Sequence, residues 1–353
     1  MTGTVALLSL EPWDETWRRN QYLCRSLLEA GDIQQVVFVA PPLRRGAPPP
    51  YEPQPGVRVV TPTLRIPRRA GGGRLVAWEL RRQLSRADLL WINDPVLGRL
   101  CLGRSGQPAL YDVTDDWRSY PFPARIRRRL VSAEDLLAER AVTVVCSDAL
   151  AQRWAERYDR RPPVVHNGVD VVRYREAMPV TLPGPGPHVG YVGTLQSERL
   201  DIPLVLDLAR SGVAGTVHLV GPDALDAQSR AELVAEPSVT LHPPRRAYEV
   251  AGVMKGMDVL LCPHRVDDFT LSLDAIKAYE YTAVGRPVVA TPTSGFQNLR
   301  VTGVTVAPRS TYVAAVAAAL SSPAPSEPVP GSDWSARAAG FAGHLRAAAE
   351  QRA

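Results

Sequence analysis

Short apolar runs alternate with longer amphipathic segments along most of the chain. Runs with the length of a buried strand occupy residues 4–10, 36–40, 89–92, 109–113, 142–146, 188–192, 216–220, 259–262 and 287–290. The segments between them, such as 17–31 and 147–158, carry apolar residues at helical spacing. Strands that alternate with helices are typical of βαβ units and parallel sheets, so the pattern predicts an α/β architecture.

The clearest βαβ unit covers residues 258–292, DVLLCPHRVDDFTLSLDAIKAYEYTAVGRPVVATP. Its helical segment ends at Gly285, as expected for a glycine that follows a helix. Lys277 and Glu280 are three residues apart and therefore share one helix face. The polar residues gather in the strand-to-helix loop, where open α/β sheets bind ligands. The alternative is a Lys–Glu pair on a solvated helix, which contributes roughly 0.2–0.5 kcal/mol.

Length and charge add to this picture. A chain of 353 residues suggests two domains of about 150 residues each. The net charge is +5, but residues 1–183 contain 27 Arg, no Lys and 20 acidic residues. This basic half could attract an anionic acceptor or a membrane surface, with the amphipathic basic helix expected over 124–141 as one candidate contact. The alternative is an ordinary solvated surface. Arg, Ala and Pro enrichment suggests a high-GC bacterial genome.

Cysteine and leader signals indicate the compartment. The four cysteines are far apart with no CxxC pair, and the six histidines lack the spacing of metal ligands. These features favour a reducing compartment and argue against a zinc site or a disulfide framework. The N-terminus has no signal-peptide pattern, and no apolar run reaches the ~20 residues that span a membrane. We therefore expect a soluble, cytoplasmic protein.

Polar residues follow the strands of the N-terminal half. Asp112 ends one expected strand, and Asp115 and Asp116 come directly after it. Clustered carboxylates at strand ends mark the ligand edge of an α/β sheet and could act as a base, although Asp also caps helices. The loop after the first strand carries Asp14 and Arg19 but no G-x-G-x-x-G, which argues against a nicotinamide-binding fingerprint.

Two loops mark the passage into the second half. Residues 164–170 read V-V-H-N-G-V-D, in which Asn-Gly favours a tight turn with positive φ. Residues 181–187, TLPGPGP, have the composition of a linker. The strand at 188–192 then leads into Gly193-Thr194-Leu195, where backbone at a helix N-terminus would suit a phosphate.

Residues 280–289, E-Y-T-A-V-G-R-P-V-V, resemble the donor-sugar signature of GT-B glycosyltransferases, most closely the retaining family-4-like group. The N-G-V-D tetrad and the loop at 193–195 are similar to further landmarks of that family, and residues 13–23 fit a W-D-x-x-W-x-R-x-Q-x-L segment found in some bacterial sugar transferases. Three family features differ. Ser272 stands where many members have a second Glu, Thr194 stands where an Arg is common, and the first loop is not glycine-rich.

The resemblance implies two Rossmann-like domains that face each other across a cleft. The expected acceptor domain is 1–180 with a C-terminal crossover helix at 334–353, and the expected donor domain is 181–333. A nucleoside-diphosphate sugar and a hydroxyl acceptor would be the substrates, with no cofactor, no metal, no nucleic acid partner and retention of anomeric configuration. The acceptor-side catalytic candidates are Asp14, Arg19, Asp112 and Asp116. The donor-side candidates are Gly193, Thr194, Arg199, His264, Thr270, Ser272, Lys277 and Glu280.

Two other functions fit the same sequence. A sugar-nucleotide 2-epimerase would need an acid and a base in the donor pocket, for which His264 and Asp267 or Asp268 are the candidates. A non-catalytic or partner-dependent nucleotide-sugar binding protein would fit the presence of Ser272 and the missing glycine loop. The first would isomerise the donor, and the second would bind it without turnover.

Overall fold

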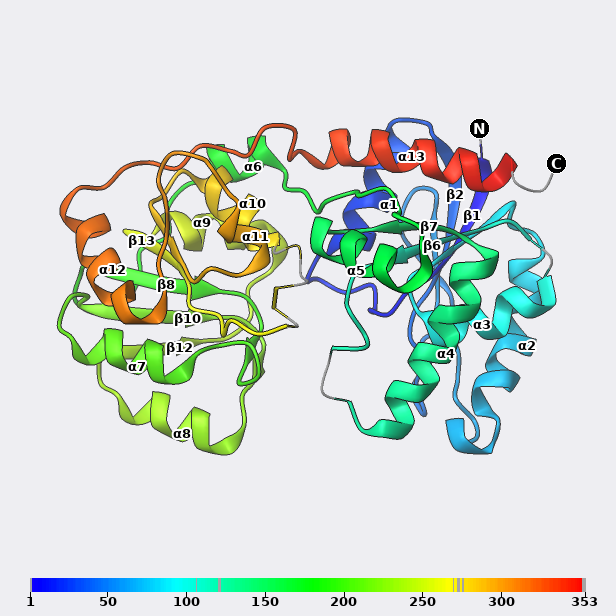
Figure 1. Ribbon diagram of the computed structural model, residues 1–353, viewed down its shortest axis with the longest axis horizontal. Coiled ribbons are helices and arrows are strands. Elements are labelled where there is room, and N and C mark those ends of the chain that lie inside the picture. Colours follow the sequence, from blue (N-terminus) through cyan, green and yellow to red (C-terminus); the bar gives the residue numbers. More distant parts are fainter. Residues whose placement is uncertain are drawn as a thin grey trace. The chain divides into compact units, whose positions relative to one another are not determined.

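The computed structural model describes residues 2–105, 107–119, 122–268, 270–271, 274 and 276–350. The chain forms two compact units, unit 1 from residues 1–166 and 334–353 and unit 2 from residues 167–333 (Figure 1). The boundary expected from the sequence is 180/181. Residues 167–176 belong to unit 2 because the short helix α6 (Val171–Glu176) packs against α10 (Ile276–Val284).

Unit 1 contains a seven-stranded sheet with the order β3-β4-β2-β1-β5-β6-β7. Its strands are β1 Thr2–Leu8, β2 Ile33–Val39, β3 Tyr51–Gln54, β4 Val57–Val60, β5 Leu89–Ile92, β6 Ala109–Val113 and β7 Val142–Val145. All pairs are parallel except the edge hairpin β3–β4. In the central strand, Leu8 pairs with Val39 on one side and Ile92 on the other.

Helices cover both faces of this sheet. They are α1 Arg19–Glu29, η1 Arg68–Ala70, α2 Gly72–Leu84, α3 Pro95–Ser105, α4 Ala124–Arg140, α5 Asp148–Tyr158 and α13 Trp334–Glu350. One face packs against α2, α3, α4 and α5, and the other packs against α1 and α13. Successive strand residues alternate between these two cores, because side chains point to opposite faces of a strand. The expected C-terminal crossover helix is therefore α13, which supplies Trp334, Phe341 and Leu345 to the second core.

Unit 2 contains a six-stranded, wholly parallel sheet with the order β12-β10-β8-β13-β14-β15. Its strands are β8 His188–Val192, β10 Thr216–Val220, β12 Val239–His242, β13 Val259–Cys262, β14 Val288–Ala290 and β15 Val304–Val306, and a small second sheet pairs β9 Leu195–Gln196 with β11 Asp223–Ala224. The helices are α6, α7 Ile202–Arg210, α8 Ala227–Ala235, α9 Ala247–Lys255, α10, α11 Ser294–Gln297, η2 Arg309–Thr311 and α12 Tyr312–Ser321. The α7, α8 and α12 helices pack on one face, and α6, α9, α10 and α11 pack on the other.

The expected βαβ unit at 258–292 is confirmed as β13, α10 and β14. Gly285 follows α10 with φ of 81°, a left-handed conformation that favours glycine. The expected Asn-Gly turn is wrong, since neither Asn167 nor Gly168 has positive φ. The side chain of Asn167 instead donates to the carbonyl of Asp274 at 2.7 Å, and its backbone amide donates to the Asp274 carboxylate at 2.5 Å.

Candidate functional site

The candidate donor site lies at the carboxyl end of the unit 2 sheet, where β8 and β13 run into loops and α10 begins. Lys277, in the first turn of α10, places its Nζ 5.0 Å from the centre of the Tyr191 ring on β8. Gly193 follows β8 with φ of 154°, and a side chain at this position would collide with the Lys277 ammonium group. The ammonium group is thus held between an aromatic face and bare backbone.

Tyr191 is the buried floor of this site. Its hydroxyl is 3.3 Å from the carbonyl of Thr194, to which it donates, and 3.2 Å from Nε2 of His264. Burial raises the pKa of Tyr191, although Lys277 favours the phenolate. Burial, helped by the charges of Lys277 and Arg199, lowers the pKa of His264 to about 3. His264 is therefore neutral at physiological pH and serves as a hydrogen-bonding partner.

Lys277 remains a cation despite its surroundings. Burial alone would lower its pKa, but the electrostatic influence of Tyr191, Glu280 and Cys262 outweighs burial and leaves the pKa raised. Arg199, between β9 and α7, adds a second positive charge at the site, as its influence on His264 and Lys277 indicates. Two cations form a suitable environment for a diphosphate. The expected helix N-terminus at residues 193–195 is wrong, because this loop runs into β9 and α7 begins only at Ile202.

Glu280 lies one helical turn beyond Lys277 and is half-buried. Its Oε1 accepts a hydrogen bond of 2.7 Å from the hydroxyl of Tyr174 on α6. Burial raises the pKa of Glu280, whereas Lys277 and the Tyr174 hydrogen bond oppose that rise. One carboxylate oxygen is fixed by Tyr174, and a half-buried carboxylate of this kind can accept hydrogen bonds from a ligand diol.

The backbone of the Gly193 loop is held by the neighbouring strand. The amide of Gly193 donates to the carbonyl of Val220 at 2.8 Å. Gly221, the residue after Val220, has a φ of 148°, and a side chain at this position would overlap the carbonyl of Gly193. Gly221 is therefore required for the close approach of the two loops, whereas Gly193 leaves room for the Lys277 side chain.

Thr270, another donor-side candidate, stabilises the loop between β13 and α10. Thr270 is buried and shares two hydrogen bonds with Asp267, of 3.0 and 2.8 Å, while its hydroxyl donates to the carbonyl of Arg265 at 2.7 Å. This arrangement favours a structural role for Thr270 and Asp267. Ser272 lies outside the described residues.

Arg286, the basic residue of the G-R-P-V-V run, has a structural contact. Its Nε and Nη2 donate to the carbonyl of Lys255 at 3.0 and 2.6 Å, where α9 ends. A cation at a helix C-terminus is favourable because the last carbonyls carry partial negative charge. Arg286 of the G-R-P-V-V run therefore connects the end of α9 to the start of β14, the strand that follows α10.

The acceptor-side candidates lie at the carboxyl edge of the unit 1 sheet. Arg19, in the first turn of α1, is 4% exposed and donates two hydrogen bonds of 3.1 Å to the fully buried carboxylate of Asp112, on β6. A paired buried arginine of this kind fixes α1 over the sheet edge. Asp14 is exposed, and its Oδ1 accepts from the Thr16 amide at 2.9 Å and from Arg18 at 3.0 Å.

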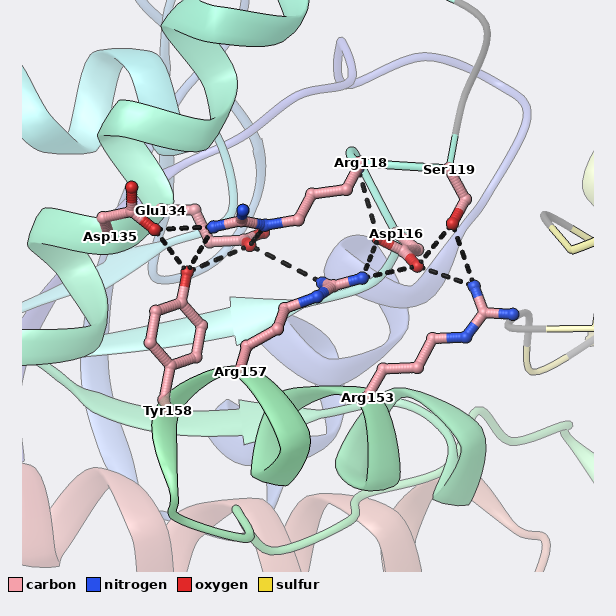
Figure 2. A network of polar contacts seen from close by, with 8 residues as sticks. All are labelled: Asp116, Arg118, Ser119, Glu134, Asp135, Arg153, Arg157 and Tyr158. Carbon is pink, nitrogen blue, oxygen red and sulfur yellow. Dashed lines mark hydrogen bonds and ion pairs between the residues drawn. The ribbon is translucent and has the colours of Figure 1, made fainter.

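Asp116 is enclosed by cations instead (Figure 2). Arg153 and Arg157, on α5, donate to its carboxylate at 2.6 and 3.0 Å, and Ser119 donates at 2.8 Å. Burial alone would raise the pKa of Asp116, but these three hydrogen bonds outweigh it and lower the pKa to about 2. Figure 2 also shows the adjoining Arg118, which binds Glu134, Asp135 and Tyr158. This network favours a structural role for Asp116.

Two partners in these sites carried no sequence signal. Tyr174 lies 106 residues before Glu280, on a helix of six residues that the sequence did not predict. Tyr191 lies inside a buried strand, where an aromatic residue reads as ordinary core. Only the fold brings each of them to α10.

Within the described residues, no group of three or more His, Cys, Asp or Glu side chains is arranged to hold a metal ion. Across the same part of the chain, no helix combines the length and apolar character needed to cross a membrane.

Two family models match the chain. Residues 16–168 match a glycosyl transferase 4-like domain, and residues 186–322 match glycosyl transferases group 1. The chain is 27% identical over 220 residues to TuaH of Bacillus subtilis (strain 168), which carries the provisional name teichuronic acid biosynthesis glycosyltransferase. That alignment covers 57% of this chain and 55% of TuaH, so the match spans about half of each.

Solved structures share the fold. Sucrose-phosphate synthase from Thermosynechococcus elongatus superposes with a TM-score of 0.70 at 18% identity, over 99% of this chain and 97% of that one. Anabaena HepE, solved in complex with UDP-glucose, superposes with a TM-score of 0.66 at 16% identity, over 100% and 98% of the two chains. With matching models over both halves and two parallel-sheet Rossmann-like units, this chain belongs to the GT-B glycosyltransferases.

Proposed function

We propose that this chain transfers a sugar from a nucleoside-diphosphate sugar to a hydroxyl acceptor, and that the donor binds in unit 2. The observation that carries the proposal is the Lys277 ammonium group, held against the Tyr191 ring and the Gly193 backbone. HepE, which shares the fold, was solved with UDP-glucose, and this supports the choice of donor class.

Each donor group has a role that its chemistry suits. Lys277 and Arg199 neutralise the diphosphate, whose negative charge grows as the glycosidic bond breaks. The free lone pairs of Glu280 accept hydrogen bonds from the ribose hydroxyls, while Tyr174 holds the carboxylate in place. In this proposal two protein cations stabilise the leaving group and no metal takes part.

The acceptor is proposed to bind at the carboxyl edge of the unit 1 sheet. Arg19 and Asp112 neutralise one another there, so they position α1 and its preceding loop. Asp14, which is exposed on that loop, is the candidate to contact an acceptor hydroxyl. We further propose retention of anomeric configuration, which rests on the family resemblance.

A cytoplasmic location belongs to the same proposal. It is supported by Cys24, Cys101, Cys146 and Cys262, which are all free and buried thiols. Proteins of oxidising compartments more often carry disulfides.

The donor site is tested with Lys277→Met and Glu280→Gln. UDP, GDP, dTDP and ADP would be screened by calorimetry, with NAD as a negative control. We expect one diphosphate to bind the wild type, and each substitution to weaken it about tenfold or more, since a hydrogen bond to a charged group contributes roughly 1.5–3 kcal/mol.

Lys255→Met is the matched control, because Lys255 is the only other lysine in the sequence and contacts the Arg175 carbonyl on another helix. Equal affinity in the wild type, Lys277→Met and Glu280→Gln would reject the donor site. Donor binding with no sugar transfer to any acceptor would instead favour a binding protein.

A further inference from the structure

Unit 1 has a concave site that neither Arg19 nor Asp112 lines, which we call the arginine pocket. It has a volume of about 390 Å³ and lies where the start of α2, the first turns of α3 and the second turn of α4 meet. Figure 1 shows these three helices side by side on one face of the sheet. Its cationic lining consists of Arg68, Arg69, Arg74, Arg99 and Arg129.

The arginines of the pocket have no carboxylate partner in the part of the chain that the structure describes. Among the described residues, no Asp or Glu forms an ion pair with any of the five. Arg99 donates to the hydroxyl of Ser132, which is neutral. All five side chains are exposed, in contrast to Arg153 and Arg157 of the same unit, which share Asp116.

One acidic group, Asp94, is electrostatically coupled to the pocket but is already hydrogen-bonded. Asp94 is 8% exposed, and its Oδ1 accepts hydrogen bonds from the amides of Val96 and Leu97 at 2.8 and 3.0 Å. Asp94 therefore caps α3. The charges of Arg68 and Arg129 oppose the rise in its pKa that burial causes, but neither arginine forms an ion pair with it. The pocket therefore keeps a strong positive potential in the free protein.

The backbone of the pocket leaves room for a ligand. Residues 71–73 are three successive glycines at the start of α2. A side chain on Gly71 would meet nothing within 4 Å, and one on Gly73 would approach Cδ1 of Leu100 to 3.1 Å and the Arg129 guanidinium to 3.4 Å. Gly73 thus permits α2 to lie close to Leu100 on α3 and adds no side chain between the arginines.

We propose that the arginine pocket binds a phosphate or diphosphate group. A guanidinium group forms paired hydrogen bonds with phosphate oxygens, and a carboxylate has too few oxygens to engage five arginines. A diphosphate carries several negative charges and enough acceptor oxygens to bridge arginines from three helices.

We expect the acceptor to carry this phosphate or diphosphate group. The α2 and α3 helices follow β4 and β5, so the pocket opens at the same carboxyl edge of the sheet as the proposed acceptor site. This assignment of the phosphate to the acceptor rests on the proposed function, whereas phosphate binding itself does not. The acceptor would be either a soluble sugar phosphate or a lipid-borne phosphate.

The test is calorimetric titration of inorganic pyrophosphate into the wild type, Arg74→Ala/Arg129→Ala and the control Arg82→Ala. Arg82 is an exposed arginine on α2 outside the pocket. We expect the double variant to bind pyrophosphate about tenfold more weakly or worse, and Arg82→Ala to bind like the wild type. Thermal unfolding checks that the double variant is folded, which its exposed positions favour.

Lys277→Met separates this site from the donor site. Pyrophosphate binding that survives Lys277→Met and is lost in the double variant supports the pocket even if no sugar transfer is found. Sedimentation with vesicles of phosphatidylcholine, alone or mixed with phosphatidylglycerol, identifies the carrier. Retention by the mixed vesicles that the double variant loses indicates a lipid phosphate, and pyrophosphate binding without retention indicates a soluble one. Equal behaviour of the double variant and Arg82→Ala in both assays would overturn the proposal.

Discussion

Mild acid should destabilise unit 2 through a row of three histidines that crosses its sheet. His188 Nδ1 is 3.0 Å from His218 Nε2, and His218 Nδ1 is 2.9 Å from His242 Nε2, so the contacts span β8, β10 and β12. His218 is fully buried. A neutral imidazole donates with one nitrogen and accepts with the other, which suits a position in the middle of the row.

The sign of the effect follows from the pKa of His218. Burial, followed by the influence of His242 and His188, lowers that pKa from 6.5 to about 4. The unfolded chain therefore binds a proton more readily than the folded chain. The stabilisation is fully present above pH 6.5 and is lost as the pH falls toward 4. Integrated from about pH 7.5 to about pH 5, the loss due to His218 is about 2 kcal/mol. His242 adds to this loss because burial and Arg245 also lower its pKa, and His264 adds to it because burial lowers its pKa to about 3.

Urea unfolding at the two pH values measures this loss. All seven tryptophans belong to unit 1, so their fluorescence follows unit 1, while far-UV circular dichroism follows both units. With a urea dependence of about 2 kcal/mol per M, His218 alone should lower the unit 2 midpoint by about 1 M between the two pH values. In His218→Gln we expect the pH difference to shrink by about 1 M, the part that His218 contributes, while the parts that His242 and His264 contribute remain. An unchanged pH difference in His218→Gln would refute the reasoning.

Two further substitutions test the contacts around each site. Tyr174→Phe removes the hydroxyl that donates a hydrogen bond to Glu280. We expect donor affinity to fall about threefold to tenfold, with little change in unfolding temperature. An unaltered affinity by calorimetry would show that Glu280 needs no such partner. Asp116→Asn removes the carboxylate charge that Arg153 and Arg157 share, and we expect unit 1 to lose about 2 kcal/mol by tryptophan fluorescence, with donor affinity unchanged. A loss of transfer without a loss of stability would restore the catalytic interpretation of Asp116.

The sequence predicts local elements well where length, periodicity and a terminating residue agree. The segment from β13 to β14 has all three, and the i,i+3 spacing of Lys277 and Glu280 is enough to place both side chains on one face of α10. The apolar run that forms β6 likewise places the Asp112 and Asp116 carboxylates at the sheet edge.

Long-range partners are beyond such reasoning. Asp116 reads as a free carboxylate in the sequence because Arg153 and Arg157 follow about 40 residues later, on a helix whose orientation is set by packing. Asn167 is expected to form a turn. Its backbone amide and its side-chain amide instead donate hydrogen bonds to Asp274, which lies 107 residues later in the sequence. In each instance the residue type is informative, and the partner that decides its role comes from tertiary structure.

The arrangement of the chain has a consequence for folding during synthesis. Unit 2 is inserted in unit 1, since the chain leaves unit 1 after residue 166 and returns at Trp334. The side chains of Trp334, Phe341 and Leu345 in α13 complete the core that α1 begins. A growing chain therefore exposes one apolar face of the unit 1 sheet until all of unit 2 has been made, and unit 2 is the first part that can fold as a whole. A nascent unit 1 needs protection from aggregation for the time that a ribosome takes to translate the intervening residues 167–333.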